Sequence, residues 1–223
     1  MHRPLFTAAL AVAAVLLTGC ASGDDWSEGP HPRPSAVGEL SAGFLGPDTS
    51  PAPESTVTPS PGSWSRVHPS DGIRVVLLTA GHDRPTKTLV TAVQEWAQDE
   101  DVDLRTVTAT DAGDLVPAIT RAMDMHPDLV VSAGNDLIDP LAAVTPNHLA
   151  QQFLVVGAEL AEPTQNVTAV DWSGASFRGE GLGMSSTYDA SSFTAARCAA
   201  AVRAGTAAVL ARHTGIVLWL EDF

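Results

Sequence analysis

The sequence predicts an α/β domain of the Rossmann-like or flavodoxin-like type, with a doubly wound parallel sheet. Between about Gly72 and Phe223, short runs rich in Val, Ile and Leu alternate along the chain with longer stretches of helical period. These runs are apolar throughout, which is typical of strands that are covered on both faces. About 150 residues are enough for one such domain.

The elements follow in a regular order. IRVVLLTA is the first buried strand, and TLVTAVQEWAQDE is the first amphipathic helix. A Gly/Ser-rich loop is expected at 173–190, and Cys198 is expected to be a small buried residue of the last helix. We expect strands at 73–80, 104–109, 128–133, 152–157, 166–171 and 215–220, and helices at 87–99, 113–124, 138–150 and 192–212.

The first strand-to-helix turn, GHDRPTKT at 81–88, is close to a nucleotide-binding P-loop. The second glycine of that motif is replaced by Thr86, and Pro85 removes a backbone donor, so the loop is poorly suited to wrap a phosphate. Phosphate hydrolysis is therefore not predicted. The safer interpretation is that this turn begins the helix, with Thr86 as its N-cap.

The N-terminus predicts export and a lipid anchor. Residues 1–20 have a basic start followed by an uncharged apolar run, which is the pattern of a signal peptide and too short to span a membrane. The run ends in Leu-Thr-Gly-Cys, which resembles the lipobox of bacterial lipoproteins. We therefore expect lipidation of Cys20, and a protein held on the extracytoplasmic face of the cell membrane.

Residues 21–70 are rich in Pro, Ser, Gly and Thr and show no sustained apolar period. This composition predicts a disordered tether, because too little apolar surface is available to offset the entropy of ordering. The expected organisation is thus a signal peptide at 1–20, a tether at 21–70 and a folded domain at 71–223.

The overall charge excludes one class of partner. The formal net charge is −14, and no basic patch interrupts it. An acidic chain of this kind repels phosphate backbones, so nucleic acid is not an expected partner.

Polar clusters follow the predicted strands, where the strands of a parallel sheet meet at one edge and ligands of such folds bind. Each residue in them has a local alternative, because Asp and Asn also cap helices and form turns. Five clusters at one edge nevertheless favour a pocket there. They are Gly81-His82-Asp83, Thr110-Asp111, Gly134-Asn135-Asp136, Gly157-Ala158-Glu159 and Asp171-Trp172.

The stretch PDLVVSAGNDLIDPLAAVTPNHLAQQFLVVGAEL, followed by NVTAVDW, resembles the first lobe of the type I periplasmic binding fold. It is most similar to the basic membrane protein (BMP) lipoproteins, which are substrate-binding proteins of ABC importers, often for nucleosides. The matching segments are Asp128 to Gly134, Gln152 to Val156 and Asn166-Val167. Proteins of that family have two lobes, and the folded part here corresponds to one.

The resemblance implies a small polar, nucleoside-like solute and an ABC permease as partners. It places ligand contacts at Asn135, Asp136 and Asp171, to which we add His82 and Asp83 of the first loop. A nucleoside base would need an aromatic platform, for which Trp172, Phe177 and Tyr188 are the candidates.

No signature of catalysis is present in the sequence. The segment DWSGASFRGEG lacks the G-x-S-x-G pattern, and no H-E-x-x-H or paired-cysteine spacing occurs. We therefore expect a non-enzymatic protein without metal or cofactor that binds a small solute. The alternatives are an envelope lipoprotein that binds a protein partner through the same edge or the 173–190 loop, and an exported hydrolase of unrecognised type.

Overall fold

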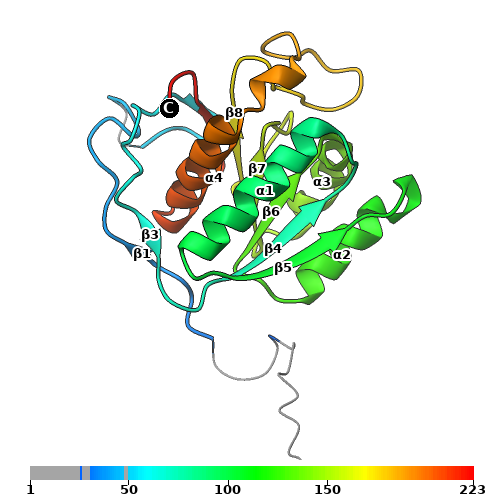
Figure 1. The fold of residues 1–223 in the computed structure, drawn as a ribbon, viewed down its shortest axis with the longest axis horizontal. Helices are drawn as coiled ribbons and strands as arrows, with labels where there is room; N and C mark the ends of the chain where they lie inside the picture. Colours follow the sequence, from blue (N-terminus) through cyan, green and yellow to red (C-terminus); the bar gives the residue numbers. More distant parts are fainter. Residues whose placement is uncertain (1–25, 27–30, 48–49) are drawn as a thin grey trace, which may run out of the picture.

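The computed structural model describes residues 26, 31–47 and 50–223. Its centre is a seven-stranded parallel sheet with the order β2-β9-β8-β7-β6-β4-β5 (Figure 1). The predicted α/β class is confirmed. The strands of the sheet are β2 (Thr56–Val57), β4 (Arg74–Thr79), β5 (Asp103–Thr108), β6 (Leu129–Ala133), β7 (Gln152–Val156), β8 (Val167–Asp171) and β9 (Val217–Trp219).

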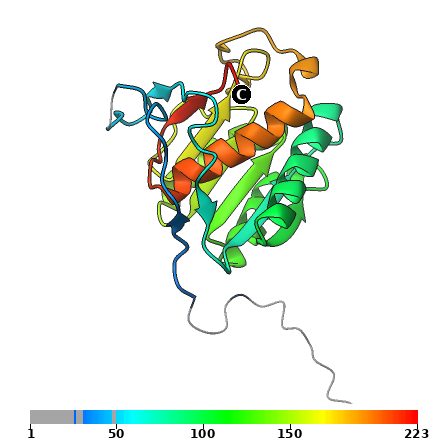
Figure 2. The same ribbon diagram turned by 60° about the vertical axis from the view of Figure 1, so that its left-hand side comes forward.

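Helices cover both faces of this sheet, as Figures 1 and 2 show. One face carries α1 (Arg84–Asp99) and α4 (Ala195–Leu210), and the other carries α2 (Leu115–Asp124) and α3 (Ile138–Val144). Successive residues of a strand point to opposite faces, so the interior strand β4, between β6 and β5, supplies both apolar layers. Val75 and Leu77 pack under α1 and α4, whereas Val76 and Leu78 pack under α2 and α3.

The remaining elements are short. They are the antiparallel pair β1 (Ala36–Val37) and β3 (His68–Pro69), and the 3-10 turns η1 (Ala112–Asp114), η2 (Asn135–Leu137), η3 (Thr145–Asn147) and η4 (Ala190–Ser192). Within the described part of the chain, no helix is both long enough and apolar enough to cross a membrane.

The predicted elements match the observed ones apart from their ends. The helix expected at 138–150 stops at Val144, because Pro146 has no backbone N–H to continue the α-helical hydrogen bonds, and the chain turns into η3. Cys198 is fully buried in α4, as predicted, and burial raises the pKa of its thiol to about 12.

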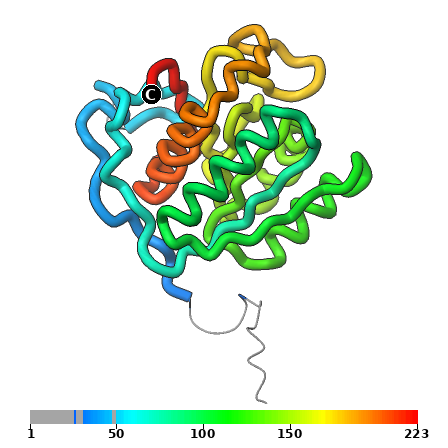
Figure 3. Tube along the Cα trace, viewed as in Figure 1, coloured from blue at the N-terminus to red at the C-terminus, as the bar shows by residue number. Residues whose placement is uncertain are grey.

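The prediction of a disordered tether up to residue 70 is wrong for residues 31–47 and 50–70, which we call the strap. Figure 3 shows the strap, blue to cyan, running up one side of the domain and back. Phe44 is 1% exposed and Trp64 is 5% exposed, and β2 forms an edge strand beside β9. Three isolated apolar residues, Phe44, Val57 and Trp64, show no period along the sequence, yet each of them joins the core under α1 and α4. Cys20 lies outside the described residues.

Helix α4 packs very closely on the sheet at Gly205. A Cβ atom at this position would lie 2.5 Å from Leu154 Cδ1 and 2.7 Å from Val170 Cγ2. Both neighbours are fully buried strand residues, so they have little room to give way. The small residue therefore sets the distance between helix and sheet.

We expect Gly205→Ala to lower the free energy of unfolding by about 1–3 kcal/mol, because overpacking a core costs more than the gain in helix propensity of about 1 kcal/mol. Urea denaturation followed by circular dichroism measures this change. Gly183→Ala is the matched control, since no atom lies within 4 Å of that Cβ position. An unchanged or higher urea midpoint for Gly205→Ala would contradict the close packing.

Candidate functional site

The candidate site lies where the direction of the chain through the sheet reverses. From β4 the chain crosses to β5 on one side, and then returns to β6 on the other side of β4. In open α/β sheets this switch point leaves a crevice at the carboxyl ends of the strands. A cavity of about 630 Å³ is found there, lined by residues that follow β4, β5 and β6 and by part of the 173–190 loop.

The turn after β4 contributes Gly81 and His82 to the cavity wall. Asp83 does not line it, and acts instead as the N-cap of α1. Its Oδ1 accepts a hydrogen bond from the Thr86 backbone N–H at 2.9 Å, and its Oδ2 accepts one from Thr86 Oγ1 at 2.8 Å. The predicted N-cap, Thr86, is thus wrong by one turn, because a carboxylate accepts both of these donors at once. GHDRPTKT begins a helix, as expected.

The turn after β6 brings Asn135 and Asp136 to the same cavity. Gly134, with φ of +121°, makes this possible, because a Cβ there would lie 2.4 Å from the carbonyl oxygen of Ala80. The two turns therefore touch through backbone, and the carboxylate of Asp136 comes to 3.5 Å from the position of a Cβ on Gly81. Among the described residues, neither Asn135 nor Asp136 has a side-chain hydrogen-bond partner, so both are available to a ligand.

The turn after β5 forms the third wall. Asp111 Oδ1 accepts the Gly113 N–H at 2.8 Å and caps η1. Asp114 Oδ2 accepts a hydrogen bond from the Thr110 backbone N–H at 3.0 Å, and Asp114 Oδ1 lies 2.7 Å from a guanidinium nitrogen of Arg121. The hydrogen bond from this guanidinium lowers the pKa of Asp114 to about 2. The wall is thus held by local hydrogen bonds, which leave the hydroxyl of Thr110 and the carboxylate of Asp111 at the rim of the cavity.

The 173–190 loop closes the fourth side with Phe177 and Glu180. Asp139 of α3 holds the loop in place, because its Oδ2 accepts the Glu180 N–H at 3.1 Å. Gly179 permits this contact, since a Cβ there would lie 2.5 Å from Asp139 Oδ1. Phe177, one of the candidates for an aromatic platform, is therefore part of the wall.

The lining has one sign of charge. It contains four carboxylates and neither Lys nor Arg among the described residues, beside the apolar surfaces of Leu115, Pro140 and Phe177. A cleft of this charge repels anions and admits neutral or cationic solutes. The four carboxylates belong to Asp111, Asp136, Asp139 and Glu180.

Asp171 and Trp172 were predicted to contact ligand, but both are fully buried and neither lines the cavity. Asp171 Oδ1 accepts the backbone N–H groups of Trp172 at 2.8 Å and Ser176 at 2.7 Å. The Trp172 indole N–H donates to Ser192 Oγ at 3.0 Å. The rings of Trp172 and Phe193 pack edge to face, with their centres 5.0 Å apart. These two residues fix both ends of the loop and are not placed to contact a solute.

The environment of Asp171 is unusual for a carboxylate. Burial raises its pKa to about 7, against the lowering effect of its two backbone hydrogen bonds, and the nearby Glu159 raises it further. Burial also raises the pKa of Glu159, although Arg178 lies 3.2 Å away and opposes the shift. The second oxygen of Asp171 has no hydrogen-bond partner within the described part of the chain. A proton on this oxygen removes the cost of a buried charge.

Tyr188, the last aromatic candidate, packs on Phe193 with the two ring centres 6.0 Å apart, and it does not line the cavity. Of the residues missed by sequence reasoning, Asp139 carried a usable signal, because it follows Asp136 by three positions and so shares its helix face. Glu180 carried none, since only the fold of the loop brings it to the cavity.

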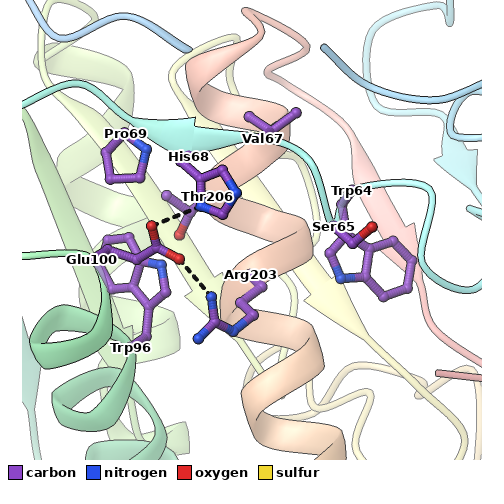
Figure 4. A pocket seen from close by; sticks show the side chains of 9 residues that line it. All are labelled: Trp64, Ser65, Val67, His68, Pro69, Trp96, Glu100, Arg203 and Thr206. Carbon is purple, nitrogen blue, oxygen red and sulfur yellow. Dashed lines mark hydrogen bonds and ion pairs between the residues drawn. The ribbon is translucent and has the colours of Figure 1, made fainter. Parts of the chain in front are cut away.

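A second cavity, of about 280 Å³, lies between α1, α4 and the strap (Figure 4). Its wall holds Trp64, Trp96 and a paired set of charges. Glu100 lies 2.8 Å from His68 Nδ1 and 2.6 Å from a guanidinium nitrogen of Arg203. These side chains already pair with one another. The pairs therefore connect the strap to the two helices, and we do not assign this cavity to a ligand.

No protein-family model matches the sequence, and no curated protein matches it either. Membership in the basic membrane protein family therefore stays a prediction.

Three solved structures show partial similarity. An ABC-transporter solute-binding protein from Aeropyrum pernix K1 is 20% identical over 46% of this chain and 29% of its own, with a TM-score of 0.42. A periplasmic ribose ABC transporter protein from Conexibacter woesei DSM 14684 is 15% identical over 68% of this chain and 55% of its own, with a TM-score of 0.34. A LacI-family transcriptional regulator from Weissella paramesenteroides, with bound sucrose, is 12% identical over 67% of this chain and 59% of its own, with a TM-score of 0.37. The chain thus spans less than two thirds of each of these proteins.

Proposed function

We propose that this protein binds a small polar solute, uncharged or positively charged, in the cavity at the carboxyl ends of β4, β5 and β6, and leaves it chemically unchanged. We further propose that a lipid on Cys20 holds it on the outer face of the cell membrane. The observation that carries the binding proposal is the position of the cavity at the switch point of the sheet, together with the side chains of His82, Asn135 and Asp136 on its wall.

The size and chemistry of the cavity support this function. About 630 Å³ falls within the range of about 300–1,000 Å³ that is usual for small-molecule sites. Phe177 offers an apolar surface for a ring or carbon skeleton, and Asn135 and Asp136 offer acceptors for hydroxyl or ammonium groups. Nucleosides, sugars and polyamines all fit this description, whereas nucleotides and other anions do not.

A thermal-shift screen of the purified protein against nucleosides, sugars, amino acids and polyamines tests the proposal, with isothermal titration of each hit. A ligand at 100 times its Kd stabilises the folded state by about 2.7 kcal/mol, which is a shift of several degrees. We expect Asp136→Asn to weaken the binding of a hit by about tenfold or more, because hydrogen bonds to a charged group contribute about 1.5–3 kcal/mol.

Glu95→Gln is the matched control, because Glu95 is an exposed carboxylate of α1 away from the cavity. It should leave both the Kd and the melting temperature unchanged. A hit that binds equally well to the Asp136→Asn and His82→Ala variants would place the solute elsewhere. A screen without any hit from well-folded protein would count against solute binding itself.

One observation favours a second candidate function, the binding of a protein partner. Leu182 is 50% exposed, Met184 is 43% exposed and Tyr188 is 39% exposed, all on the 173–190 loop beside the cavity. Exposed apolar side chains on a glycine-rich loop are suited to a contact surface. If the solute screen fails, cross-linking through Leu182→Cys in the cell envelope is the experiment that tests this alternative.

A further inference from the structure

The first described residue of the chain, Trp26, is firmly docked on the folded domain. Its side chain is 5% exposed and belongs to the apolar cluster under α2 and α3. Its indole N–H donates to Asp103 Oδ2 at 2.7 Å, and the guanidinium of Arg105 lies 4.1 Å from its ring centre. The guanidinium of Arg74 donates to its backbone carbonyl. A tryptophan held by an apolar contact, two hydrogen bonds and a cation–π contact is an anchor.

All of these contacts lie at the amino edge of the sheet, where the strands begin. Asp103 and Arg74 are the first residues of β5 and β4. A few residues further along the chain, His31 lies 2.7 Å from Asp128, which directly precedes β6 and also accepts the Arg74 N–H at 2.9 Å. Trp26 and His31 are therefore each held at the amino edge, and their partners are residues at the starts of three neighbouring strands.

The candidate cavity lies at the other edge of the same sheet. In Figures 1 and 2 the blue end of the described chain and the yellow-orange 173–190 loop lie at opposite ends of the domain. A strand of six residues, such as β4, separates the two edges by about 20 Å. The N-terminal anchor and the cavity thus face in opposite directions.

Trp26 follows Cys20 by six residues. A stretch of six residues spans at most about 20 Å even when fully extended. A lipid on Cys20 is therefore tied closely to the amino edge, whereas a free tether to residue 70 would let the domain turn in any direction.

We propose that Trp26 fixes the orientation of the domain on the membrane: the amino edge of the sheet faces the lipid surface, and the solute cavity faces away from it. This inference rests on the proposed lipid anchor at Cys20, and it is independent of whether the cavity binds a solute. It assigns the membrane as the surface that the amino edge meets. While Trp26 is docked, the solute enters the cavity from the side of the domain that faces away from the membrane.

The test uses the lipidated, full-length protein, reconstituted in phosphatidylcholine vesicles that contain lipids with a nitroxide on the headgroup. A thiol-reactive fluorophore is placed at Asp124→Cys, beside the amino edge, or at Leu182→Cys, on the loop at the carboxyl edge. Both positions are exposed, and the buried Cys198, whose pKa is raised to about 12, does not compete for the label. Mass spectrometry of each preparation establishes the lipid on Cys20.

We expect the label at position 124 to be quenched at least threefold more than the label at position 182. In Trp26→Ala this ratio should fall, because the first contact with the domain is then His31 with Asp128, and eleven residues instead of six separate Cys20 from it. Trp219→Ala is the matched control, since Trp219 of β9 is a partly buried tryptophan whose indole N–H donates to Glu221, and it should keep the wild-type ratio. Trp26→Phe, which keeps a ring beside Arg105 but loses the bond to Asp103, should give an intermediate ratio.

Each other outcome has a definite meaning. Equal quenching of the two labels in otherwise unchanged protein overturns the orientation. A ratio that survives Trp26→Ala, in protein that circular dichroism shows to be folded, overturns the role of Trp26. An unmodified Cys20 overturns the lipid anchor and with it the orientation, while the solute screen still stands or falls by itself.

Discussion

A fragment of residues 71–223, which lacks the strap, is expected to be largely unfolded at 25 °C, whereas a fragment of residues 31–223 folds. The shorter fragment loses Phe44 and Trp64, which are 1% and 5% exposed, and the edge strand β2. Removing one buried Phe or Trp side chain costs about 3–5 kcal/mol. The combined loss is comparable to the whole stability of a typical domain, about 5–15 kcal/mol.

Circular dichroism and thermal melting of the two fragments measure this difference. The double variant Phe44→Ala with Trp64→Ala in the 31–223 fragment separates the anchors from the rest of the strap, and it should account for most of the loss. Equal melting temperatures of the two fragments would show instead that the strap contributes nothing to the stability of the domain.

Asp171→Asn is expected to stabilise the protein at pH 8 and to remove most of its loss of stability between pH 4 and pH 7. The pKa of Asp171 is about 7 in the folded protein and 3.8 as its ordinary value. Between these two values the folded state holds a proton that the unfolded state has lost, so the free energy of unfolding falls as the pH rises. At about 1.4 kcal/mol for each pH unit, the effect approaches 4 kcal/mol above pH 7.

The asparagine keeps an acceptor for the N–H groups of Trp172 and Ser176 and carries no charge. Urea denaturation at pH 4, 6 and 8 should therefore give similar midpoints for the variant and the unchanged protein at pH 4, and diverging midpoints above it. A residual slope remains in the variant, because the pKa of Glu159 is also raised. Glu95→Gln should follow the unchanged protein at every pH. An Asp171→Asn variant that is less stable at pH 8 would show that the fold requires the charged carboxylate.

Asp171 shows that a polar residue at the end of a strand does not always reach the cavity. The sequence places Asp171 and Asp136 alike, each at the end of an apolar strand. In the structure, Asp136 is exposed on the cavity wall, whereas Asp171 is sealed under the 173–190 loop. The difference is made by a loop whose path depends on the contacts of Glu180 with Asp139 and of Trp172 with Ser192, pairs that are 41 and 20 residues apart in the sequence.

The sequence by itself determined the order of strands and helices, the parallel sheet and the edge at which the cavity lies. These follow from local periodicity, because every buried strand and amphipathic helix repeats its apolar pattern over many residues. Only the tertiary structure decided that the strap is folded, that Trp26 is docked at the amino edge, and which polar residues reach the cavity. Each of these depends on single side chains that meet partners far along the chain, and a lone Trp or Asp carries no periodic signal of where it will be buried.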